Sequence, residues 1–521
     1  MRTARGRVSY GPRRRPSYGR GPVETSEDAR PELADVARLG RRLMRQAVQL
    51  ARADESSVRH LLTSHFGDGA QSLPIVTATW PRYDHVNVQG GLDAWLAAPG
   101  RQHEIAGLTG FRHTDFSLAD LVQPGPWQHV GLGGVTTITL PSGPDGQTRA
   151  CVQCAIYLVR EEAGPLALLL RGPEEHGASE EVTIEAACPS QEQGQRAVDE
   201  IRRLTVEHNV FRGHVIAFGG EVFGPGRGGL LSFMNRPQIG RDQVILPADV
   251  LAGVERQVLG VARHSRRLTA SGQHLKRGVL LHGEPGTGKT HTIRYLLSEL
   301  AGTTVVVLSG SALGMISEAC SVARTLQPAL IVVEDVDLIA EERGFGMGQH
   351  PLLFQLLNEM DGLGEDLDVT FVLTTNRADL LEPALAQRPG RVDHAALLPV
   401  PDAEARLRLL HLYRGSLELD LADPDAVIAR TEGVTASFMK ELLRRAALRA
   451  AEGESAPDGG SAEPLRVTDA DLDAALSQLL DTRNELTRIL LGGRPAAPGR
   501  ARPATPGRRA GSPAGRAPGS S

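Results

Sequence analysis

The chain has 521 residues, with 57 basic and 62 acidic residues and a formal net charge of −5. This length exceeds what one hydrophobic core usually supports, so we expect about two or three domains. The small net charge argues against a strong overall attraction to nucleic acid or to an anionic membrane. Four cysteines in a chain of this length argue against a disulfide scaffold and are typical of a reducing compartment.

The sequence also lacks the usual membrane and secretion signals. No apolar run of about eighteen residues or more occurs, so a transmembrane helix is not expected. Residues 1–20 are basic but contain no apolar core, which a secretory signal would need. We therefore expect a cytoplasmic protein.

Residues 1–28 and 492–521 are predicted to be disordered tails. The first is basic and the second consists mainly of Pro, Ala, Gly and Arg, so neither has enough apolar residues to form a core. Basic tails can bind nucleic acid or a membrane surface. Solvated ends are the favoured interpretation, and nucleic acid is left open as a partner only through these tails.

Residues 29–240 are predicted to form an N-terminal α+β region. Apolar residues at helical spacing between residues 32 and 62 predict helices. From about residue 75 to residue 235, short β-type runs alternate with Gly and Pro breaks, with a helix expected over residues 191–207. We recognise no catalytic constellation in this region.

The pair Cys151 and Cys154 has the CxxC spacing of half a zinc site or of a redox motif. A structural zinc site needs four ligands, and Cys188 and Cys320 stand alone in the sequence. The surrounding run predicts a strand, which directs the two thiols to opposite faces. A buried strand is therefore the favoured interpretation. The sequence also contains no HExxH motif, so zinc protease activity is not expected.

Strands and helices alternate regularly over residues 241–401, which predicts a parallel α/β sheet. Residues 402–491 are predicted to form a small helical region. Inside the α/β part, residues 283–290 fit the GxxxxGK[ST] phosphate-loop pattern in full, between an apolar strand and a helix. The predicted fold class is therefore α/β, a P-loop NTPase parallel-sheet sandwich with a small helical lid, preceded by an α+β N-terminal region.

The composition of this loop suits the binding of ATP with Mg²⁺. Glycines let successive backbone N–H groups surround phosphate oxygens, and the following helix adds the positive end of its dipole. Lys289 is expected to reach the β- and γ-phosphates, and Thr290 is expected to offer its hydroxyl to Mg²⁺. The predicted cofactor-binding residues are Gly283, Glu284, Pro285, Gly286, Thr287, Gly288, Lys289, Thr290 and His291.

Two adjacent acids, Glu334 and Asp335, follow an apolar run some forty residues further on. In a fold of this kind the first carboxylate holds Mg²⁺ and the second polarises the attacking water. Glu334 is therefore a predicted metal ligand as well as a catalytic residue, and Asp335 is the predicted base. The alternative is a solvated acidic turn after a strand, which is less favoured downstream of a complete phosphate loop.

Three further stretches resemble the second region of homology of the AAA family, within the AAA+ superfamily of P-loop ATPases. They cover residues 352–363, 369–377 and 382–393, in the expected order. The resemblance runs from about residue 245 to residue 480. The chain is thus identified as a bacterial member of this family whose N-terminal region resembles no named domain.

The resemblance implies roles for several residues. Asn376 matches sensor 1, which positions the lytic water, and Arg388 and Arg391 match the arginine fingers that enter a neighbouring subunit's site. Fingers that act in trans imply a ring, usually a homo-hexamer. The alternative for the two arginines is a surface pair in a Pro-Gly turn. Residues 435–437 replace the Gly-Ala-Asp triplet of the sensor 2 region, so no catalytic residue is assigned there.

Three departures from the family pattern bear on activity. The order of Glu334 and Asp335 is reversed, which would shift both carboxylates and slow hydrolysis. The reversed order resembles that of the mitochondrial complex III assembly ATPase and its plant relatives, which are taken to be working enzymes, so we still expect hydrolysis. Residues 310–324 are shorter than usual where the family places its first pore loop, and only residues 313–315 could supply a weaker contact without an aromatic side chain. One residue is added at residues 386–387, before the fingers.

These observations predict an ATP-binding and ATP-hydrolysing, Mg²⁺-dependent, ring-forming enzyme that remodels a protein or complex of unknown identity, in a chaperone-like way. By family analogy, residues 29–240 would receive the substrate or an adaptor. The first alternative is an ATP-gated oligomeric scaffold with little turnover. A less favoured alternative is a nucleic-acid-associated ATPase.

Overall fold

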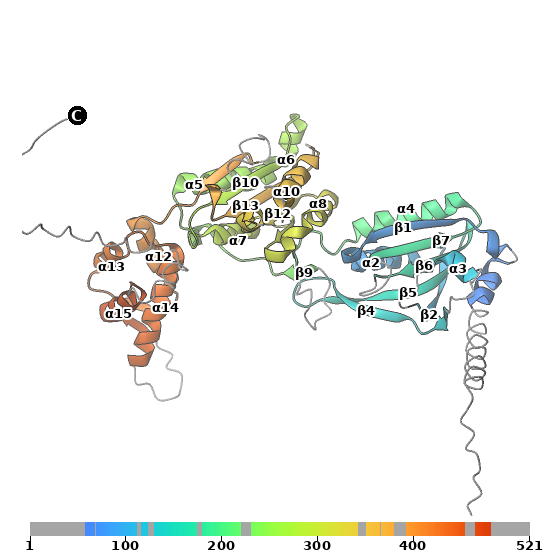
Figure 1. Cartoon of the computed structure of the whole chain (residues 1–521), viewed down its shortest axis with the longest axis horizontal. Helices are drawn as coiled ribbons and strands as arrows, with labels where there is room; N and C mark the ends of the chain where they lie inside the picture. Colours follow the sequence, from blue (N-terminus) through green and yellow to red (C-terminus); the bar gives the residue numbers. More distant parts are fainter. Residues whose placement is uncertain are drawn as a thin grey trace, which may run out of the picture.

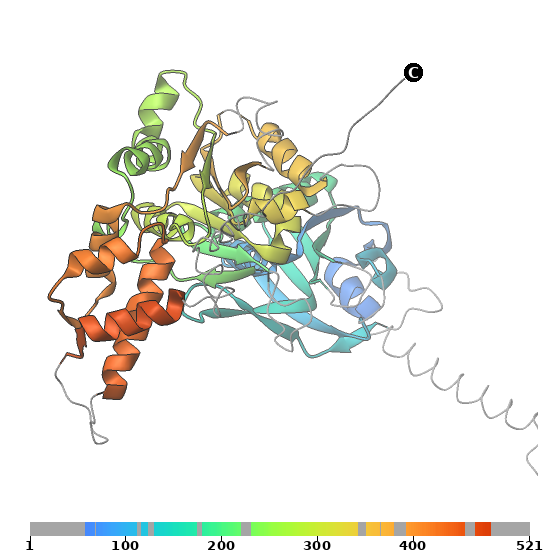
Figure 2. The same cartoon turned by 60° about the vertical axis from the view of Figure 1, so that its left-hand side comes forward.

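The computed structural model of the chain contains two seven-stranded sheets and a helical unit. Figure 1 and Figure 2 show how these parts are arranged. The structure describes residues 58–67, 69–111, 116–122, 130–173, 180–219, 231–341, 351–364, 366–379, 392–453 and 464–480. The predicted tails, residues 1–28 and 492–521, lie outside the described residues, as do Arg388, Arg391 and residues 386–387.

The first sheet belongs to the N-terminal unit, which we define as residues 58–207. Its strand order is β1-β7-β6-β5-β2-β3, with β4 beside β5, and all its pairs are antiparallel. The strands are β1 Ile75–Pro81, β2 Gln102–Thr109, β3 Gly131–Gly133, β4 Thr136–Pro141, β5 Thr148–Glu161, β6 Gly164–Arg171 and β7 Glu181–Ala187. A connected antiparallel sheet of this kind accounts for the alternation of β-type runs and Gly/Pro breaks in the sequence.

Helices cover both faces of this first sheet. α2 (His85–Leu96) and α4 (Gln191–Glu207) pack with one core, while α3 (Leu118–Val122) and the helical residues 58–66 pack with the other. The second core takes alternate residues of β5 and β6, as the strand period requires. The helix expected over residues 191–207 is thus confirmed.

The CxxC pair lies in β5 and is buried, as predicted. Cys151 packs in the core shared with the second sheet, whereas Cys154 packs in the core beneath α3. All four cysteines are free and buried. Among the described residues no three His, Cys, Asp or Glu side chains are grouped as a metal site would require. The two thiols therefore do not converge on one site.

The second sheet has the order β14-β10-β13-β12-β11-β8-β9, and every neighbouring pair is parallel except β8 with β9. Its strands are β8 Val215–Phe218, β9 Leu231–Met234, β10 Arg277–His282, β11 Thr304–Leu308, β12 Ala329–Val333, β13 Val369–Thr375 and β14 His394–Leu397. The predicted parallel α/β sheet is confirmed. Two of its strands, β8 and β9, come from the range ascribed to the N-terminal region, residues 29–240.

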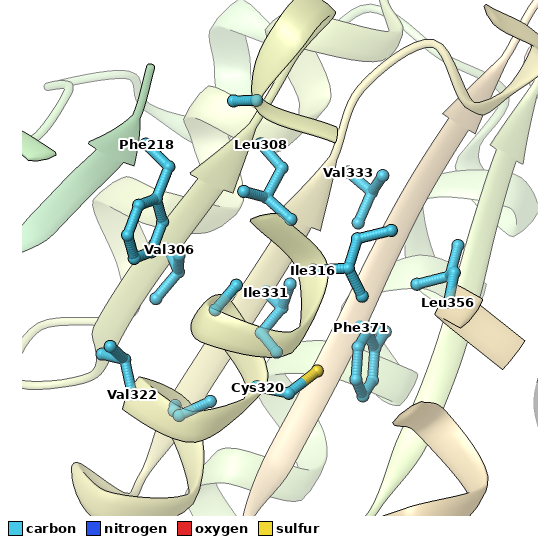
Figure 3. Close-up of a cluster of buried hydrophobic side chains, with 14 of the residues drawn as sticks. Phe218, Val306, Leu308, Ile316, Cys320, Val322, Ile331, Val333, Leu356 and Phe371 are labelled. Atoms are coloured by element: carbon cyan, nitrogen blue, oxygen red, sulfur yellow. The ribbon is translucent and has the colours of Figure 1, made fainter. Parts of the chain in front are cut away.

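Helices pack on both faces of the second sheet and enclose two apolar cores. The helices of this unit that contribute core residues are α5 Ala248–Glu255, η4 Arg256–Gly260, α7 Lys289–Glu299, η5 Gly310–Met315, α8 Ile316–Thr325, α9 Val336–Glu341 and α10 Pro351–Gly362. The unit also contains η3 Arg241–Gln243 and α6 Val261–Ala270. Figure 3 shows α8 contributing Ile316 and Cys320 to the core, beside Ile331 of β12 and Phe371 of β13. These buried runs explain why the strands read as nearly continuous apolar stretches.

The N-terminal unit shares this core with the second sheet. The ring of Tyr83, in η2 (Arg82–Asp84), meets that of Phe218 edge-on at a centroid distance of 5.6 Å. The backbone N–H of Val210 donates to Asn87 Oδ1 at 2.9 Å. An apolar contact of β8 and a polar contact of the turn before it therefore join the N-terminal unit to the second sheet.

The helical unit, called the lid below, consists of residues 403–453 and 464–480. Its elements are α12 Ala403–Tyr413, β15 Glu418–Asp420, α13 Pro424–Arg430, α14 Ala436–Gly453, β16 Arg466–Thr468 and α15 Asp469–Leu480. It has a core of its own, centred on Phe438 and Leu442. In the part of the chain that the structure describes, no helix is long and apolar enough to span a membrane.

Candidate nucleotide site

The phosphate loop joins the end of β10 to the start of α7. Three of its glycines have left-handed φ angles: +149° at Gly283, +83° at Gly286 and +104° at Gly288. Non-glycine residues rarely adopt such angles, so the loop path depends on these glycines. The first N–H groups of α7 have no partner within the helix and face the loop, where they can bind an anion.

Two of these glycines also allow close contacts with other parts of the fold. A Cβ atom on Gly283 would lie 2.4 Å from the carbonyl oxygen of Leu398. A Cβ atom on Gly286 would lie 2.9 Å from Thr435 Oγ1 and 3.0 Å from Ser437 of the lid. The N–H of Ser437 donates to the Gly286 carbonyl at 3.1 Å. The lid therefore rests directly on the phosphate loop.

The contact of residues 435–437 with the phosphate loop was not predicted from the sequence. They replace the expected triplet and were assigned no catalytic residue, yet they contact the loop through Thr435 and Ser437. The contact joins residues some 150 positions apart in the chain, so no local pattern shows it. The only sequence signal was their position at the start of α14, in the region that resembles sensor 2.

Lys289 is buried, with 7% of its surface exposed, and its ammonium group closes the loop on itself. Nζ donates to the carbonyls of Gly283 at 2.8 Å and Glu284 at 3.0 Å. Burial lowers the pKa of Lys289, and the nearby charges of Asp335 and Asp337 oppose that effect. A phosphate entering the loop would offer this cation a charged acceptor, which binds more strongly than a carbonyl.

The remaining loop residues differ in their surroundings. Thr287 is buried and its hydroxyl donates to the Glu284 carbonyl at 2.9 Å, whereas Glu284, Pro285 and Thr290 are exposed. His291 is half-buried, and its Nε2 lies 3.0 Å from the carbonyl oxygen of Gln243 in η3. The exposed hydroxyl of Thr290 is therefore open to a ligand, while the ring of His291 is engaged with η3.

The two acids follow β12 and lie beside the end of β13. Asp335 has a left-handed φ of +53°, and its N–H donates to Thr374 Oγ1 at 2.9 Å. Asn376 Nδ2 donates to Asp335 Oδ1 at 3.2 Å. A non-glycine residue at such an angle costs about 1–3 kcal/mol, and such strain is common at functional sites. The structure thus brings the predicted base and the predicted sensor together.

A third carboxylate, Asp337, was not assigned a role from the sequence. It is 8% exposed, and its Oδ1 accepts hydrogen bonds from Thr375 Oγ1 at 2.9 Å and from the Asn376 N–H at 3.1 Å. These bonds fix the end of β13 from which the Asn376 side chain extends. The signal in the sequence was the acid two positions after Asp335.

The donor set suits Mg²⁺ together with a nucleotide. Mg²⁺ prefers oxygen ligands and usually binds through one or two protein groups, substrate phosphates and water. Thr290 offers a hydroxyl, and half-buried Glu334 offers a carboxylate at the end of the adjoining parallel strands. A site with few protein ligands agrees with the absence of any three-ligand group among the described residues.

The shortened segment at residues 310–324 exposes fewer side chains for a pore contact than the sequence suggested. Gly310–Met315 forms η5 and leads directly into α8, and Leu313 is 4% exposed. Met315 is half-buried against the same core. The expectation that residues 313–315 offer a weaker grip is therefore wrong for Leu313, because the core already holds its side chain.

A parallel sheet with a glycine-rich loop before α7 and carboxylates at the ends of neighbouring strands defines a P-loop nucleotide-binding protein. Residues 279–400 match the family described as "ATPase family associated with various cellular activities (AAA)". The chain therefore contains an AAA ATPase domain in this stretch.

Curated relatives match part of the chain. The ATP-dependent zinc metalloprotease FtsH of Nitrosococcus oceani is 30% identical over 250 residues, covering 44% of this chain and 39% of the relative. FtsH of Staphylococcus haemolyticus is 33% identical over 218 residues, covering 39% and 30%. FtsH 1 of Symbiobacterium thermophilum is 33% identical over 247 residues, covering 43% and 41%. The chain thus spans less than half the length of these relatives.

Proposed function

We propose that this chain binds ATP with Mg²⁺, hydrolyses it, and uses the resulting motion to remodel a protein or complex. The observation that carries this proposal is the hydrogen bond between Asn376 and Asp335, which faces the end of the sheet where the phosphate loop and buried Lys289 lie. An acid held by a polar side chain beside a phosphate loop has the parts needed to orient a water molecule.

Each group has a distinct task in this proposal. Loop N–H groups and Lys289 bind the β- and γ-phosphates, while Thr290 and Glu334 hold Mg²⁺, which supplies charge neutralisation to the phosphates. Asp335 accepts a proton from the attacking water, and Asn376 orients that water through its amide. The reversed acid pair moves each carboxylate by about one methylene, and a misplacement of about 1 Å can cost on the order of a hundredfold in rate.

The working unit in this proposal is a ring of identical chains. Arg388 and Arg391 would enter the neighbouring subunit's site. There, their planar, permanently charged guanidinium groups would stabilise the charge that spreads over the transferring phosphoryl group. The contact between Ser437 and Gly286 supports a lid that responds to the state of the loop. We propose a homo-hexamer, with the N-terminal unit receiving the substrate or an adaptor.

The protease activity named for the relatives is not part of this proposal, because the sequence contains no HExxH motif. The second candidate is an ATP-gated oligomeric scaffold with little turnover. The reversed acids and the burial of Leu313 favour it, since both weaken the case for a threading motor. The two candidates share the nucleotide site and differ in the rate of turnover.

Steady-state ATP turnover of the full chain with Mg²⁺ tests the proposal, beside D335N and R388A and with particle mass measured in each state. Glu452→Gln is the matched control, since Glu452 is exposed at the end of α14. We expect both site variants to lose turnover while the control keeps it, with ATP-dependent hexamers in the parent. Negligible turnover in the parent together with ATP-driven assembly would favour the scaffold instead.

A further inference from the structure

One helix of the parallel-sheet unit carries a concentration of positive charge that the whole-chain balance hides. α6 (Val261–Ala270) follows η4 and stands out from its unit in Figure 1 and Figure 2. Residues 256–277 contain six Arg and Lys residues and no acidic residue, although the chain as a whole has a net charge of −5. Local charge of this kind decides binding at a surface, whatever the total.

Among the described residues, several of these cations have no partner of opposite charge. Arg256, Arg266 and Arg267 are exposed, and none forms an ion pair with another residue that the structure describes. Arg263 Nη2 lies 3.3 Å from Glu299 Oε2, but both side chains are well exposed, so that pair binds weakly. Arginines therefore dominate this surface.

The spacing of the arginines places them side by side. Arg263, Arg266 and Arg267 follow the i, i+3, i+4 pattern, so they are neighbours on the helix surface. Like charges at this spacing destabilise a helix unless a ligand neutralises them. Lys276 and Arg277, further along, donate to backbone carbonyls and belong to the support of the unit rather than to this surface.

The surface lacks the apolar groups that other acidic partners require. None of the large hydrophobic side chains that are exposed among the described residues lies in residues 248–277. Protein interfaces usually need apolar or aromatic anchors, and helices that lie on membranes need an apolar face. The phosphate backbone of nucleic acid needs only cations at suitable spacing.

We propose that α6 binds the phosphate backbone of nucleic acid, independently of sequence. The site is separate from the phosphate loop: Glu299, next to Arg263, ends α7, and the loop precedes Lys289 at the other end of that helix. Eleven helical residues place the two sites about 15 Å apart. This role differs from the tails, which were the only basic segments that the sequence left open for nucleic acid.

Fluorescence anisotropy of a labelled double-stranded DNA oligonucleotide tests the proposal with the full chain, over about 50–200 mM salt. The test variant carries R256Q, R266Q and R267Q. The matched control carries R196Q, R212Q and R414Q, which remove the same charge from exposed positions elsewhere. Thermal unfolding midpoints of both variants check that the fold is kept, and labelled polyglutamate serves as an acidic peptide probe.

We expect the α6 variant to lose about tenfold or more in DNA affinity and its slope of log affinity against log salt to fall by about two to three. The control should stay within about twofold of the parent, because scattered arginines do not act together. Equal binding by the two variants, or no DNA binding by the parent, would overturn the proposal. Binding of polyglutamate but not of DNA would also overturn it, in favour of an acidic protein.

Discussion

Asn376 and Asp335 come from the ends of two neighbouring strands and meet through a hydrogen bond of 3.2 Å. The bond joins the amide of one proposed catalytic residue to the carboxylate of the other. Because β12 and β13 pair in parallel, their carboxyl ends lie at the same edge of the sheet. The sheet register therefore sets the distance between the two groups.

Removing the amide of Asn376 should slow hydrolysis more than it weakens nucleotide binding. We expect Asn376→Ala to lower kcat by about tenfold to a hundredfold, because it removes an oriented donor beside the base. Steady-state turnover together with equilibrium binding of a fluorescent ATP analogue would separate the two effects. Gln195→Ala is the control, because Gln195 is exposed. Asn87→Ala would be unsuitable, because Asn87 accepts a hydrogen bond from Val210 that links the N-terminal unit to the second sheet. A variant with weaker binding and unchanged kcat would contradict the assignment.

Gly286 should not tolerate a side chain. Its φ is +83°, and an added methyl group would lie within 3.0 Å of Thr435 Oγ1 and Ser437. We expect Gly286→Ala to weaken nucleotide binding about tenfold or more, since left-handed strain of about 1–2 kcal/mol adds to the clash with the lid. Binding titrations check this. Gly314→Ala is the control, because no atom lies within 4 Å of its added methyl group, and equal affinities for the two variants would refute the expectation.

Asp84 should make stability depend on pH. Burial raises the pKa of Asp84 from 3.8 to about 6, although Asn87 Nδ2 donates to it at 2.8 Å. The folded state then binds more protons than the unfolded state between about pH 4 and pH 6, so the free energy of unfolding falls as pH rises through this window. Asp84→Asn should therefore be more stable than the parent at pH 7 by about 1–3 kcal/mol, and much less so at pH 4.

Denaturant unfolding of the parent and of Asp84→Asn at several pH values measures this difference. Glu162→Gln, at an exposed turn, is the control and should show no growing difference. If the advantage of Asp84→Asn were the same at pH 4 and pH 7, ionisation of the buried carboxyl would not be its cause.

Phe218 should stabilise both sheets at once. It is 3% exposed and lies in the core that joins the N-terminal unit to the parallel sheet. We expect Phe218→Ala to cost about 3–5 kcal/mol and to speed amide hydrogen exchange in both α2 and α8. Phe354→Ala is the control, since Phe354 is 42% exposed on α10. Faster exchange in only one of the two helices would show that the units unfold separately.

Local patterns predicted the parts of the molecule that local geometry governs. The strand, glycine-rich loop and helix around Lys289 are adjacent in sequence, so spacing alone located the phosphate loop. The buried strand of Cys151 and Cys154 followed from the period of two. The contact of Ser437 with Gly286 depends on how the lid packs, and the support of Asn376 by Asp337 depends on strand register. The sequence places Ser437 near the start of α14 and Asp337 two positions after Asp335, but it shows neither contact.

Burial explains the main errors and omissions. From the sequence, residues 313–315 could supply a weak pore contact, but Leu313 lies in the short η5 and is buried in the core. β8 is only four residues long, and nothing in its sequence indicates which sheet it joins. In a single sequence, a short apolar run that is exposed cannot be distinguished from one that is buried. Only tertiary packing determines which it is.

The pairing of β8 with β11 determines where this protein can be divided. Val215, Ile216 and Ala217 lie beside Val305, Val306 and Val307. A truncated chain that starts at residue 241 would lack β8, so the backbone N–H and C=O groups of β11 that pair with it would be exposed. An exposed strand edge of this kind promotes aggregation. The parallel-sheet unit therefore cannot be expressed intact without the β8 segment that precedes it.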